Sequence, residues 1–233
     1  MEKGSGRPSS DGMNYDLSFN LIWRPFDKLA DGLLLSLKLA TVSIAIAMAI
    51  GLSLALAYTD GNRFVRAAVT AYVEFVRNVP LLLLVYLVFY GLPTVVDIRY
   101  DATTSFVATL SLYGGAYLVE VLRAGLQAVP QGLIEAGKAI GLTPVQRLVH
   151  VRLPTAFRIA LPSLSNTYVS LFKDTSIASV LAVPELAYGA QWINLNTFRI
   201  VEVYAVVTPM YLVTGYGILF ALRLLERRFA IAG

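Results

Sequence analysis

The chain has 233 residues, of which 57% are hydrophobic and only 15% are charged, with a formal net charge of +4 and no cysteine. A soluble domain is about 25% charged and about 45–50% apolar, so this composition and a mean hydropathy of +0.65 indicate a polytopic membrane protein and disfavour a secreted enzyme or a nucleic-acid-binding domain. The lack of cysteine in the sequence excludes disulfides, thiolate metal sites and cysteine nucleophiles.

The N-terminal part of the chain is polar. Residues 1–12, MEKGSGRPSSDG, have neither the apolar core nor the small-residue cleavage site of a signal peptide. We expect residues 1–28 to form a polar tail and an extracytoplasmic lead-in. Residues 29–228 are expected to form the membrane domain, and residues 229–233 a short C-terminal tail.

Five apolar stretches follow, each near the roughly 20 residues that a helix needs to cross a bilayer. They cover about Leu33–Tyr58, Ala71–Leu92, Thr103–Leu122, Ile159–Val183 and Val203–Leu222. The fourth is the least regular, because two charged residues, Lys173 and Asp174, interrupt it. The sequence therefore predicts an all-α, multi-pass membrane fold with about five transmembrane helices.

Five spans place the two termini on opposite sides of the membrane. Lys and Arg are more numerous in the segments that follow the first, third and fifth spans than in the other segments. Because the side richer in Lys and Arg normally faces the cytoplasm, we expect the N-terminus outside and the C-terminus in the cytoplasm. One sizeable cytoplasmic loop, at about residues 124–158, then lies between the third and fourth spans.

The pattern of this loop predicts two short helices with a break between them. Gly141 suits a left-handed helix C-cap, Thr143 suits an N-cap, Pro144 suits the first helical position, and Gln146 completes a capping box with Thr143. Pro154 is expected to end the second helix, because proline lacks the backbone N–H that a helix interior needs.

The second of these helices has an apolar face. Its members are Val145, Leu148, Val149 and Leu153. An apolar face on an element that projects from the membrane needs a protein partner to cover it. The loop is therefore the place where we expect a functional contact.

The loop also carries a recognisable motif. The run Glu135-Ala136-Gly137, then three residues, Gly141, nine residues and Val151-Arg152-Leu153-Pro154 resembles the EAA loop of ABC importer permeases. Gly137 stands where that family has a second alanine, and Val151 stands where it has isoleucine. Both changes are small in size, and the spacing is intact.

Three flanking blocks resemble one branch of that family, the polar amino-acid permeases of the histidine, glutamine and glutamate type. The blocks are Tyr72–Leu82, Tyr117–Gly125 and Lys173–Ser176. With the loop, they make four blocks in the family's order, and the resemblance covers nearly everything after about Leu29. On these residues the chain is identified as a member of this branch.

The resemblance implies the type I importer permease fold and a permease subunit that moves a polar L-amino acid into the cytoplasm by alternating access. It implies the bacterial cytoplasmic (inner) membrane as the location. The implied partners are a second permease subunit, in a homo- or heterodimer, two ATP-binding subunits, an extracytoplasmic amino-acid-binding protein and membrane lipid. ATP and Mg belong to the partner ATPase, so no cofactor, metal or nucleic acid is expected on this chain, and no enzymatic activity. The sequence contains no phosphate-binding loop motif.

The same resemblance makes the cytoplasmic loop a coupling helix that sits in a cleft of the ATPase. Its candidate ATPase-coupling residues are Glu135, Ala136, Gly137, Gly141, Leu153 and Pro154. Glu135 is the candidate for a charged contact with the partner. The alternative for Glu135 is an ordinary solvated carboxylate on a helix face.

Lys173 and Asp174 are candidates for the substrate path, together with Thr175 and Ser176. A charge at bilayer depth costs at least about 2.5 kcal/mol on insertion scales and usually faces a bundle interior or water. Neighbouring helical residues point about 100° apart, so we expect Lys173 to face the path or a subunit interface while Asp174 caps a helix that restarts at Thr175. The alternative is a structural pair that does not contact substrate.

Two pairs spaced i,i+3, Glu74 with Arg77 and Glu120 with Arg123, are expected to fix helices at the cytoplasmic membrane boundary. Pro80 is expected to kink the second span, because it removes a backbone donor.

Three further expectations concern residues outside the expected spans. Glu202 is explained as a surface charge, and residues 185–200 are expected to form a short outer element that contacts a binding protein. His150, the only histidine, has no neighbouring ligands in the sequence, so neither a metal site nor a Ser-His-Asp centre is expected.

Two other functions compete with an importer permease. A stand-alone secondary transporter is expected to show internal symmetry and intramembrane ion ligands, and the sequence shows no clear repeat. A membrane assembly subunit without a transport path would not need the projecting two-helix loop.

Overall fold

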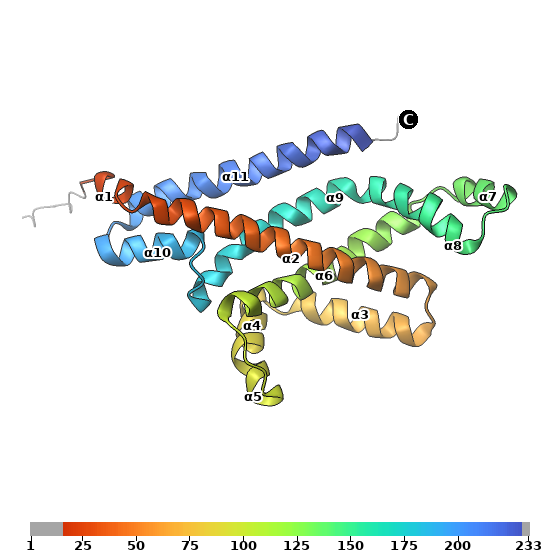
Figure 1. Ribbon diagram of the computed structural model, residues 1–233, viewed down its shortest axis with the longest axis horizontal. Helices are drawn as coiled ribbons and strands as arrows, with labels where there is room; N and C mark the ends of the chain where they lie inside the picture. Colours follow the sequence, from red (N-terminus) through yellow and green to blue (C-terminus); the bar gives the residue numbers. More distant parts are fainter. Residues whose placement is uncertain (1–15, 230–233) are drawn as a thin grey trace, which may run out of the picture.

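The computed structural model describes residues 16–229, and the regular elements within this range are helices. Four long helices, α2 (Phe26–Asp60), α6 (Ala102–Gln127), α9 (Leu153–Asp174) and α11 (Ile200–Phe229), run roughly along the long axis of the molecule (Figure 1). The shorter elements are α1 (Asn20–Trp23), α3 (Arg63–Asn78), α4 (Leu81–Tyr86), η1 (Leu87–Gly91), α5 (Leu92–Val96), α7 (Gln131–Ala139), α8 (Pro144–Arg147), η2 (Leu148–Arg152), η3 (Thr175–Leu181) and α10 (Leu186–Thr197). The predicted all-α fold is confirmed.

The contact between α2 and α6 forms the centre of the bundle, and small residues bring the two helices close. A Cβ atom added at Gly51 of α2 would lie 2.6 Å from the Cβ of Leu118, and one added at Gly114 of α6 would lie 3.2 Å from the Cβ of Ala47. Lipid tails are as apolar as the side chains, so membrane helices associate through close packing of this kind.

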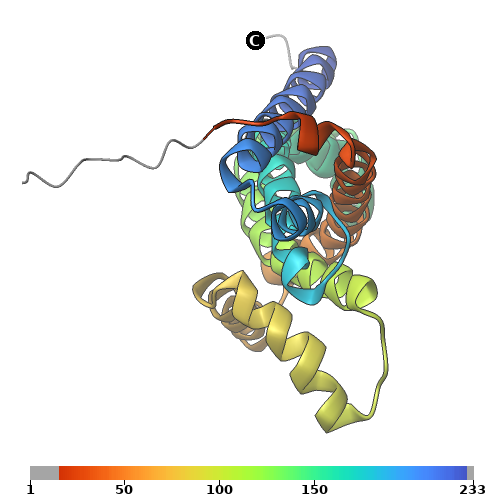
Figure 2. The same ribbon diagram turned by 90° about the vertical axis from the view of Figure 1, so that its left-hand side faces the viewer.

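The second expected span is bent rather than straight. α3 ends at Asn78, and α4 begins at Leu81 at an angle of 105° to α3. The residue before a proline avoids the helical region, and Val79 accordingly has an extended backbone with ψ of 131°. The predicted kink at Pro80 is therefore present as a full break, and α4 and α5 project away from the bundle (Figure 2).

Among residues 16–229, three helices are long and apolar enough to cross a membrane, namely α2, α6 and the part of α11 from residue 200 to 228. The bent pair of α3 with α4 and α5 makes a fourth if it is counted as one span. The remaining expected span corresponds to α9, which is more polar and contains Arg158 and Lys173. Its crossing of the membrane stays a prediction.

One expected break is wrong, because Pro154 does not end a helix. α8, η2 and α9 follow one another without interruption from Pro144 to Asp174. The π-helical turn η2 places the N–H of Leu153 on the carbonyl of Leu148, and such a widened turn gives the proline ring room within a continuing helix. The second loop helix is therefore continuous with the fourth expected span.

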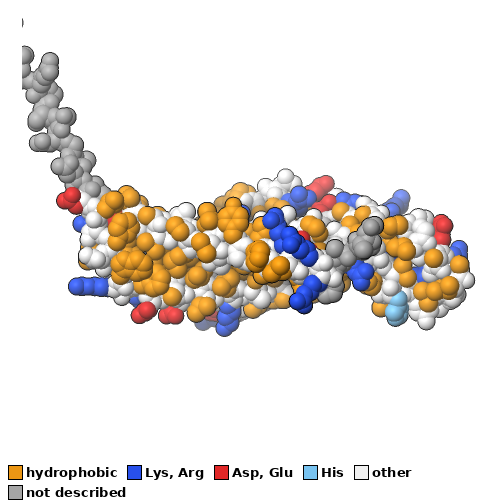
Figure 3. Space-filling view, turned by 90° about the horizontal axis from the view of Figure 1, so that it is seen from above, with side chains coloured by type: hydrophobic (Ala, Val, Ile, Leu, Met, Phe, Trp, Pro, Cys, Tyr) orange, Lys and Arg blue, Asp and Glu red, His pale blue; other side chains and the backbone are white. Residues whose placement is uncertain are grey.

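The molecule has two distinct ends. α1, α10 and the first turns of α2 lie at one end, and α7 and α8 lie at the other (Figure 1). Hydrophobic side chains dominate the left half of the face seen in Figure 3. On α11, Leu212, Val213 and Phe220 are 55%, 67% and 66% exposed, so this helix presents an apolar surface suited to lipid or to a further membrane subunit.

Candidate coupling and transport sites

The loop between α7 and α8 ends α7 with a defined hydrogen-bond pattern. After α7, Gly141 has a φ of +84°, in the left-handed region that favours glycine. The N–H of Gly141 donates to the carbonyl of Lys138, and the N–H of Leu142 donates to the carbonyl of Gly137, both at 3.0 Å. These two bonds form a Schellman motif, so the predicted left-handed glycine C-cap is confirmed.

Two residues after Gly141, Thr143 caps the start of α8. The Thr143 hydroxyl accepts from the N–H of Gln146 at 3.3 Å, and the Gln146 side-chain oxygen accepts from the N–H of Thr143 at 2.9 Å. This is the predicted capping box, with Pro144 at the first helical position. Arg147 closes the turn by donating from Nη1 to the carbonyl of Leu142 at 2.6 Å.

The tip of the loop exposes apolar side chains. Ile140 is 77% exposed, Val145 69%, Val149 49% and Leu133 44%. The predicted apolar face is thus exposed at Val145 and Val149, and Ile140 and Leu133 of the α7 segment extend it. Exposed apolar side chains on an element with a fixed backbone are typical of a protein-binding surface.

The base of the loop is tied to α2. Arg152 of η2 lies 3.7 Å from the carboxylate of Asp60, the last residue of α2. A cavity of about 340 Å³ separates the loop from this end of α2. Its lining residues are Asp60, Ile134, Pro144, Val145, Arg147, Leu148 and Arg152.

The candidate coupling residues differ in their surroundings. Glu135, Ala136 and Pro154 are exposed, whereas Gly137 is buried against Arg147. Leu153 is half-buried and packs against the core between α2, α6 and α9. A Cβ added at Gly137 would lie 3.4 Å from Cγ of Arg147, an ordinary contact, so the alanine that the family motif has at this position would fit. The coupling role of these residues stays a prediction.

Asp174 lines a cavity of about 340 Å³ between α6 and α9. The cavity is lined by Tyr113, Tyr117, Asn166, Thr167, Ser170, Leu171 and Asp174. The hydroxyls of Tyr113 and Tyr117 lie 3.1 Å apart, and the guanidinium of Arg77 lies over the Tyr117 ring at 5.1 Å. A carboxylate, two phenol hydroxyls and a guanidinium therefore lie close together at this place.

Lys173 points to a different cavity, of about 350 Å³, between α9 and α11. Its other lining residues are Val169, Thr208, Tyr211, Leu212, Gly215, Tyr216 and Leu219. Lys173 and Asp174 therefore line different cavities on two sides of α9, as their angular separation of about 100° predicts. The predicted cap by Asp174 is wrong: Asp174 has helical φ and ψ angles and its side chain makes no capping hydrogen bond, because η3 continues from α9 without a restart.

Thr175 and Ser176 use their hydroxyls within the helix. Thr175 is buried and donates to the carbonyl of Phe172 at 2.6 Å, and Ser176 donates to the carbonyl of Lys173 at 2.8 Å. Both bonds satisfy carbonyls where α9 tightens into the 3₁₀ turn of η3. Their place in a substrate path stays a prediction.

The two expected boundary pairs have different structures. Arg123 and Glu120 form an ion pair at 2.8 Å, and the Arg123 guanidinium lies 5.2 Å from the centre of the Tyr58 ring. Arg77 instead lies over Tyr117, and the carbonyl of Glu74 accepts from the Asn78 side chain at 2.7 Å. Only the first pair therefore joins its two charges directly among residues 16–229.

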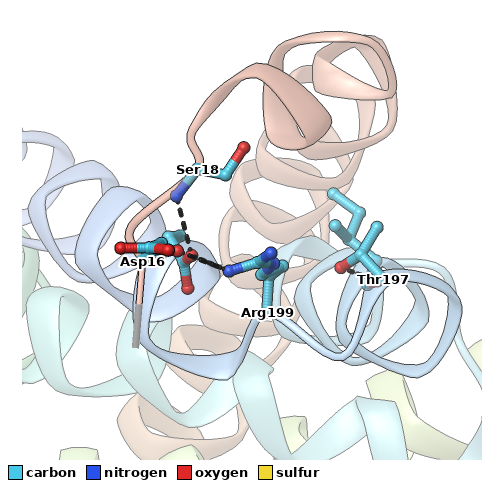
Figure 4. Close-up of polar contacts among 6 residues, drawn as sticks. Asp16, Ser18, Thr197 and Arg199 are labelled. Carbon is cyan, nitrogen blue, oxygen red and sulfur yellow. Dashed lines mark hydrogen bonds and ion pairs between the residues drawn. The ribbon is translucent and has the colours of Figure 1, made fainter. Parts of the chain in front are cut away.

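Glu202 is not a surface charge, as the sequence suggested, because its side chain is fully buried. Arg199 lies 3.3 Å from its carboxylate, and the backbone N–H of Ser18 donates to the same carboxylate at 3.0 Å. Arg199 also donates to the carbonyl of Asp16 at 2.6 Å (Figure 4). The group ties the chain before α1 to the start of α11, a contact between residues about 180 positions apart.

Glu185 is a buried residue that sequence reasoning missed. It precedes α10, is 0% exposed, and accepts from the N–H groups of Ala187 and Tyr188 at 2.9 and 2.8 Å. The hydroxyls of Ser36 on α2 and Tyr211 on α11 donate to it at 3.2 and 2.9 Å. The position of Glu185 just before α10 could have suggested an N-cap. Its contacts with α2 and α11 could not be predicted from the neighbouring sequence.

The helices and loop described above match a known protein family. Residues 47–231 match the family described as "Binding-protein-dependent transport system inner membrane component". The chain belongs to this family. It is thus a multi-pass inner-membrane transport component and not an enzyme, and the recognition of an ABC importer permease from its four motifs is confirmed.

Two curated relatives illustrate the match. The chain is 33% identical over 220 residues to the glutamine transport system permease protein GlnP of Escherichia coli, covering 94% of this chain and all of the relative. It is 37% identical over 159 residues to the probable glutamine ABC transporter permease protein GlnM of Bacillus subtilis, covering 68% of this chain and 73% of the relative.

Solved structures agree with the fold. A chain from the crystal structure of an amino acid ABC transporter with histidines superposes with a TM-score of 0.84 at 29% identity, covering 92% of this chain and 100% of that one. A chain from an inward-facing MetNI methionine ABC transporter superposes with a TM-score of 0.78 at 20% identity over the same shares. The type I importer permease fold predicted from the sequence is therefore confirmed.

Proposed function

We propose that this chain is the permease subunit of an ABC importer for a polar L-amino acid. In this proposal it forms a homo- or heterodimer with a second permease subunit. Two ATP-binding subunits that hold ATP and Mg bind the cytoplasmic side, and an extracytoplasmic binding protein delivers the amino acid. The observation that carries the proposal is the cytoplasmic loop, in which a fixed backbone presents exposed apolar side chains at one end of the bundle.

A rigid loop can transmit movement from a partner to the membrane domain. The Schellman motif at Gly141 and the capping box at Thr143 hold the loop in one shape, and η2 joins it without a break to α9. A displacement of the exposed tip is therefore carried into the membrane domain instead of being lost in a flexible loop. We assign the ATPase contact to this tip, which includes Glu135, Ile140 and Val145.

The names of the relatives and the polar groups beside α9 support a polar amino acid as the substrate. The relatives' names refer to glutamine, cystine and arginine, all polar amino acids. Asp174 and the hydroxyls of Tyr113 and Tyr117 offer acceptors for the ammonium group of an amino acid, and Lys173 offers a cation for its carboxylate. We propose that one or both of these grooves line the path, with the binding protein contributing to the choice of amino acid.

The proposed orientation places α10 outside the cell and the α7–α8 loop in the cytoplasm. Because the chain has no native cysteine, single cysteines report on sidedness without background. Leu195→Cys, at a side chain that is 71% exposed on α10, should react with a membrane-impermeant maleimide in intact cells. Gln131→Cys, exposed at the start of α7, should react only after lysis, and the reverse pattern would invert the proposed topology.

The direct test is uptake of labelled amino acids into proteoliposomes that contain this chain, its neighbouring ATPase and its binding protein. Uptake should require ATP and should be lost in Ile140→Glu, which puts a charge on the exposed tip, while Ile140→Leu should restore it. Assembly of each variant is checked by copurification of the ATPase. Uptake by this chain alone, driven by an ion gradient, would instead establish a stand-alone secondary transporter.

A further inference from the structure

α10 and the first turns of α2 lie at the end of the molecule opposite the α7–α8 loop (Figure 1), and a groove lies between them. It encloses about 460 Å³. We call it the α2–α10 groove and define it by its lining residues, Lys28, Asp31, Leu35, Pro184, Tyr188, Gly189 and Trp192.

The two walls of the groove are locked together. At Gly32 an added Cβ would lie 2.8 Å from the backbone carbon of Glu185, and at Gly189 it would lie 3.2 Å from the carbonyl oxygen of Lys28. The buried Glu185 carboxylate adds hydrogen bonds to Ser36 of α2 and to the first N–H groups of α10. The groove is therefore preformed, and a ligand would meet it without reorganising either helix.

The rim of the groove carries both signs of charge beside an aromatic ring. Lys28 and Asp31 are exposed and one helical turn apart on α2, and the Lys28 ammonium lies 4.3 Å from the centre of the Trp192 ring. Within residues 16–229 neither Lys28 nor Asp31 forms an ion pair. A cation, an anion and an aromatic side chain are thus presented together to whatever approaches this end.

We propose that the α2–α10 groove is a docking site for the extracytoplasmic binding protein, with Lys28 and Asp31 pairing opposite charges on it and Trp192 as the apolar anchor. This inference rests on the proposed function and orientation. The family is described as binding-protein-dependent, so a binding protein is the expected partner. In the proposed orientation the groove lies at the extracytoplasmic end, where that protein would approach. Aromatic anchors surrounded by charged rim residues are typical of protein interfaces.

A protein loop fits this groove better than a free amino acid does. Small-molecule sites usually bury about 70–90% of the ligand, whereas here the rim cation and anion are exposed and Trp192 is 37% exposed. Both charged side chains are exposed, so they can steer the encounter with a second protein. We therefore place the amino acid deeper and its carrier protein at the groove.

The test is a titration of the ATPase activity of the complete complex in nanodiscs with the purified, amino-acid-loaded binding protein encoded beside this chain. Lys28→Glu and Asp31→Lys should each raise the concentration for half-maximal stimulation at least tenfold, and the effect should shrink at high salt because exposed charges are screened. Trp192→Ala should do the same, and Trp192→Phe should retain most of the affinity. Arg99→Glu, an exposed charge outside the groove, is the matched control and should leave the curve unchanged.

The outcomes separate the inference from the proposed function. Curves for Lys28→Glu and Asp31→Lys that superpose on the wild-type curve, in complexes that assemble normally, would overturn the docking site and leave the importer intact. A change in the amino-acid concentration dependence with unaltered binding-protein affinity would also overturn it, in favour of a small-molecule subsite. A wild-type complex that does not respond to any binding protein would overturn the proposed function itself.

Discussion

Gly32 is the position where a single methyl group should separate α10 from α2. An alanine Cβ there would lie 2.8 and 2.9 Å from the backbone carbon and oxygen of Glu185 and 2.9 Å from the backbone nitrogen of Leu186. Carbon contacts are optimal at about 3.5–4.0 Å, so α10 must move by roughly 0.7 Å. These atoms are backbone and cannot rotate away.

The magnitude follows from two opposing effects. Overpacking of this kind costs about 1–3 kcal/mol, whereas replacing a helical glycine with alanine gains about 0.5–1 kcal/mol. The expected net loss for Gly32→Ala is about 0–2.5 kcal/mol, and the shift should weaken the Glu185 bond to Ser36. Gly132→Ala is the matched control, because an added Cβ there meets nothing within 4 Å.

The assay is thermal unfolding of the purified permease in detergent, followed by tryptophan fluorescence. The variant at Gly32 should unfold at a lower temperature than wild type, and the variant at Gly132 should unfold at an equal or slightly higher temperature. Equal unfolding temperatures for the two variants would refute the close contact between α2 and the start of α10.

The remaining predictions concern single elements. Gly137→Ala should stabilise α7 by about 0.5–1 kcal/mol, whereas Gly141→Ala should cost about 1–2 kcal/mol from its left-handed backbone; the two must differ in sign in thermal unfolding. Thr143→Ala should cost about 1 kcal/mol through loss of the capping box, and unchanged stability would contradict the cap. Hydrogen bonds from Thr104 lower the pKa of Asp101, so its stabilisation of the α6 N-terminus is present above an unfolded pKa of about 4 and lost as the pH falls through the lower folded pKa. Asp101→Asn should keep the cap and remove this pH dependence, measured as unfolding temperature between about pH 6 and pH 3.

The sequence predicted best those features whose cause is local. Gly141, Thr143 and Gln146 determine the break in the loop through hydrogen bonds that span at most five residues, so the pattern alone is sufficient. Pro80 likewise acts on its immediate neighbour, although the size of the bend depends on how α4 packs afterwards.

Two predictions from local rules were wrong because the helix continues where an end or a start was expected. Pro154 was expected to end a helix, but the π-helical turn η2 absorbs it. Asp174 was expected to start one, but η3 continues directly from α9 and leaves no free N-terminus to cap. Both errors come from the assumption that a helix keeps one hydrogen-bond register.

Buried acidic residues could not be predicted from the sequence. Glu185 meets Ser36, which is 149 positions away, and Glu202 meets the backbone N–H of Ser18, which is 184 positions away. No pattern within a span shows that α2, α10 and α11 converge at one end. A carboxylate near a span end therefore looks like a surface charge until its partners are known.

One helix, α2, runs from the α2–α10 groove to the base of the α7–α8 loop. Lys28 and Asp31 line the α2–α10 groove near its start, and Asp60 at its last residue lies 3.7 Å from Arg152 of the loop. At about 1.5 Å per residue, its 35 residues span roughly 52 Å. A displacement of the loop can therefore reach the groove through a single element whose centre is packed closely on α6.

From this arrangement we expect Asp60 to contribute to coupling and little to stability. The Asp60 side chain is 60% exposed, and exposed ion pairs contribute about 0–1 kcal/mol, so Asp60→Ala should barely change the unfolding temperature. It should, however, lower the number of amino acids imported per ATP hydrolysed, because Arg152 loses its link to α2, and Asp60→Glu should restore that ratio. An unchanged ratio in Asp60→Ala would show that the loop acts on the membrane domain through α9 alone.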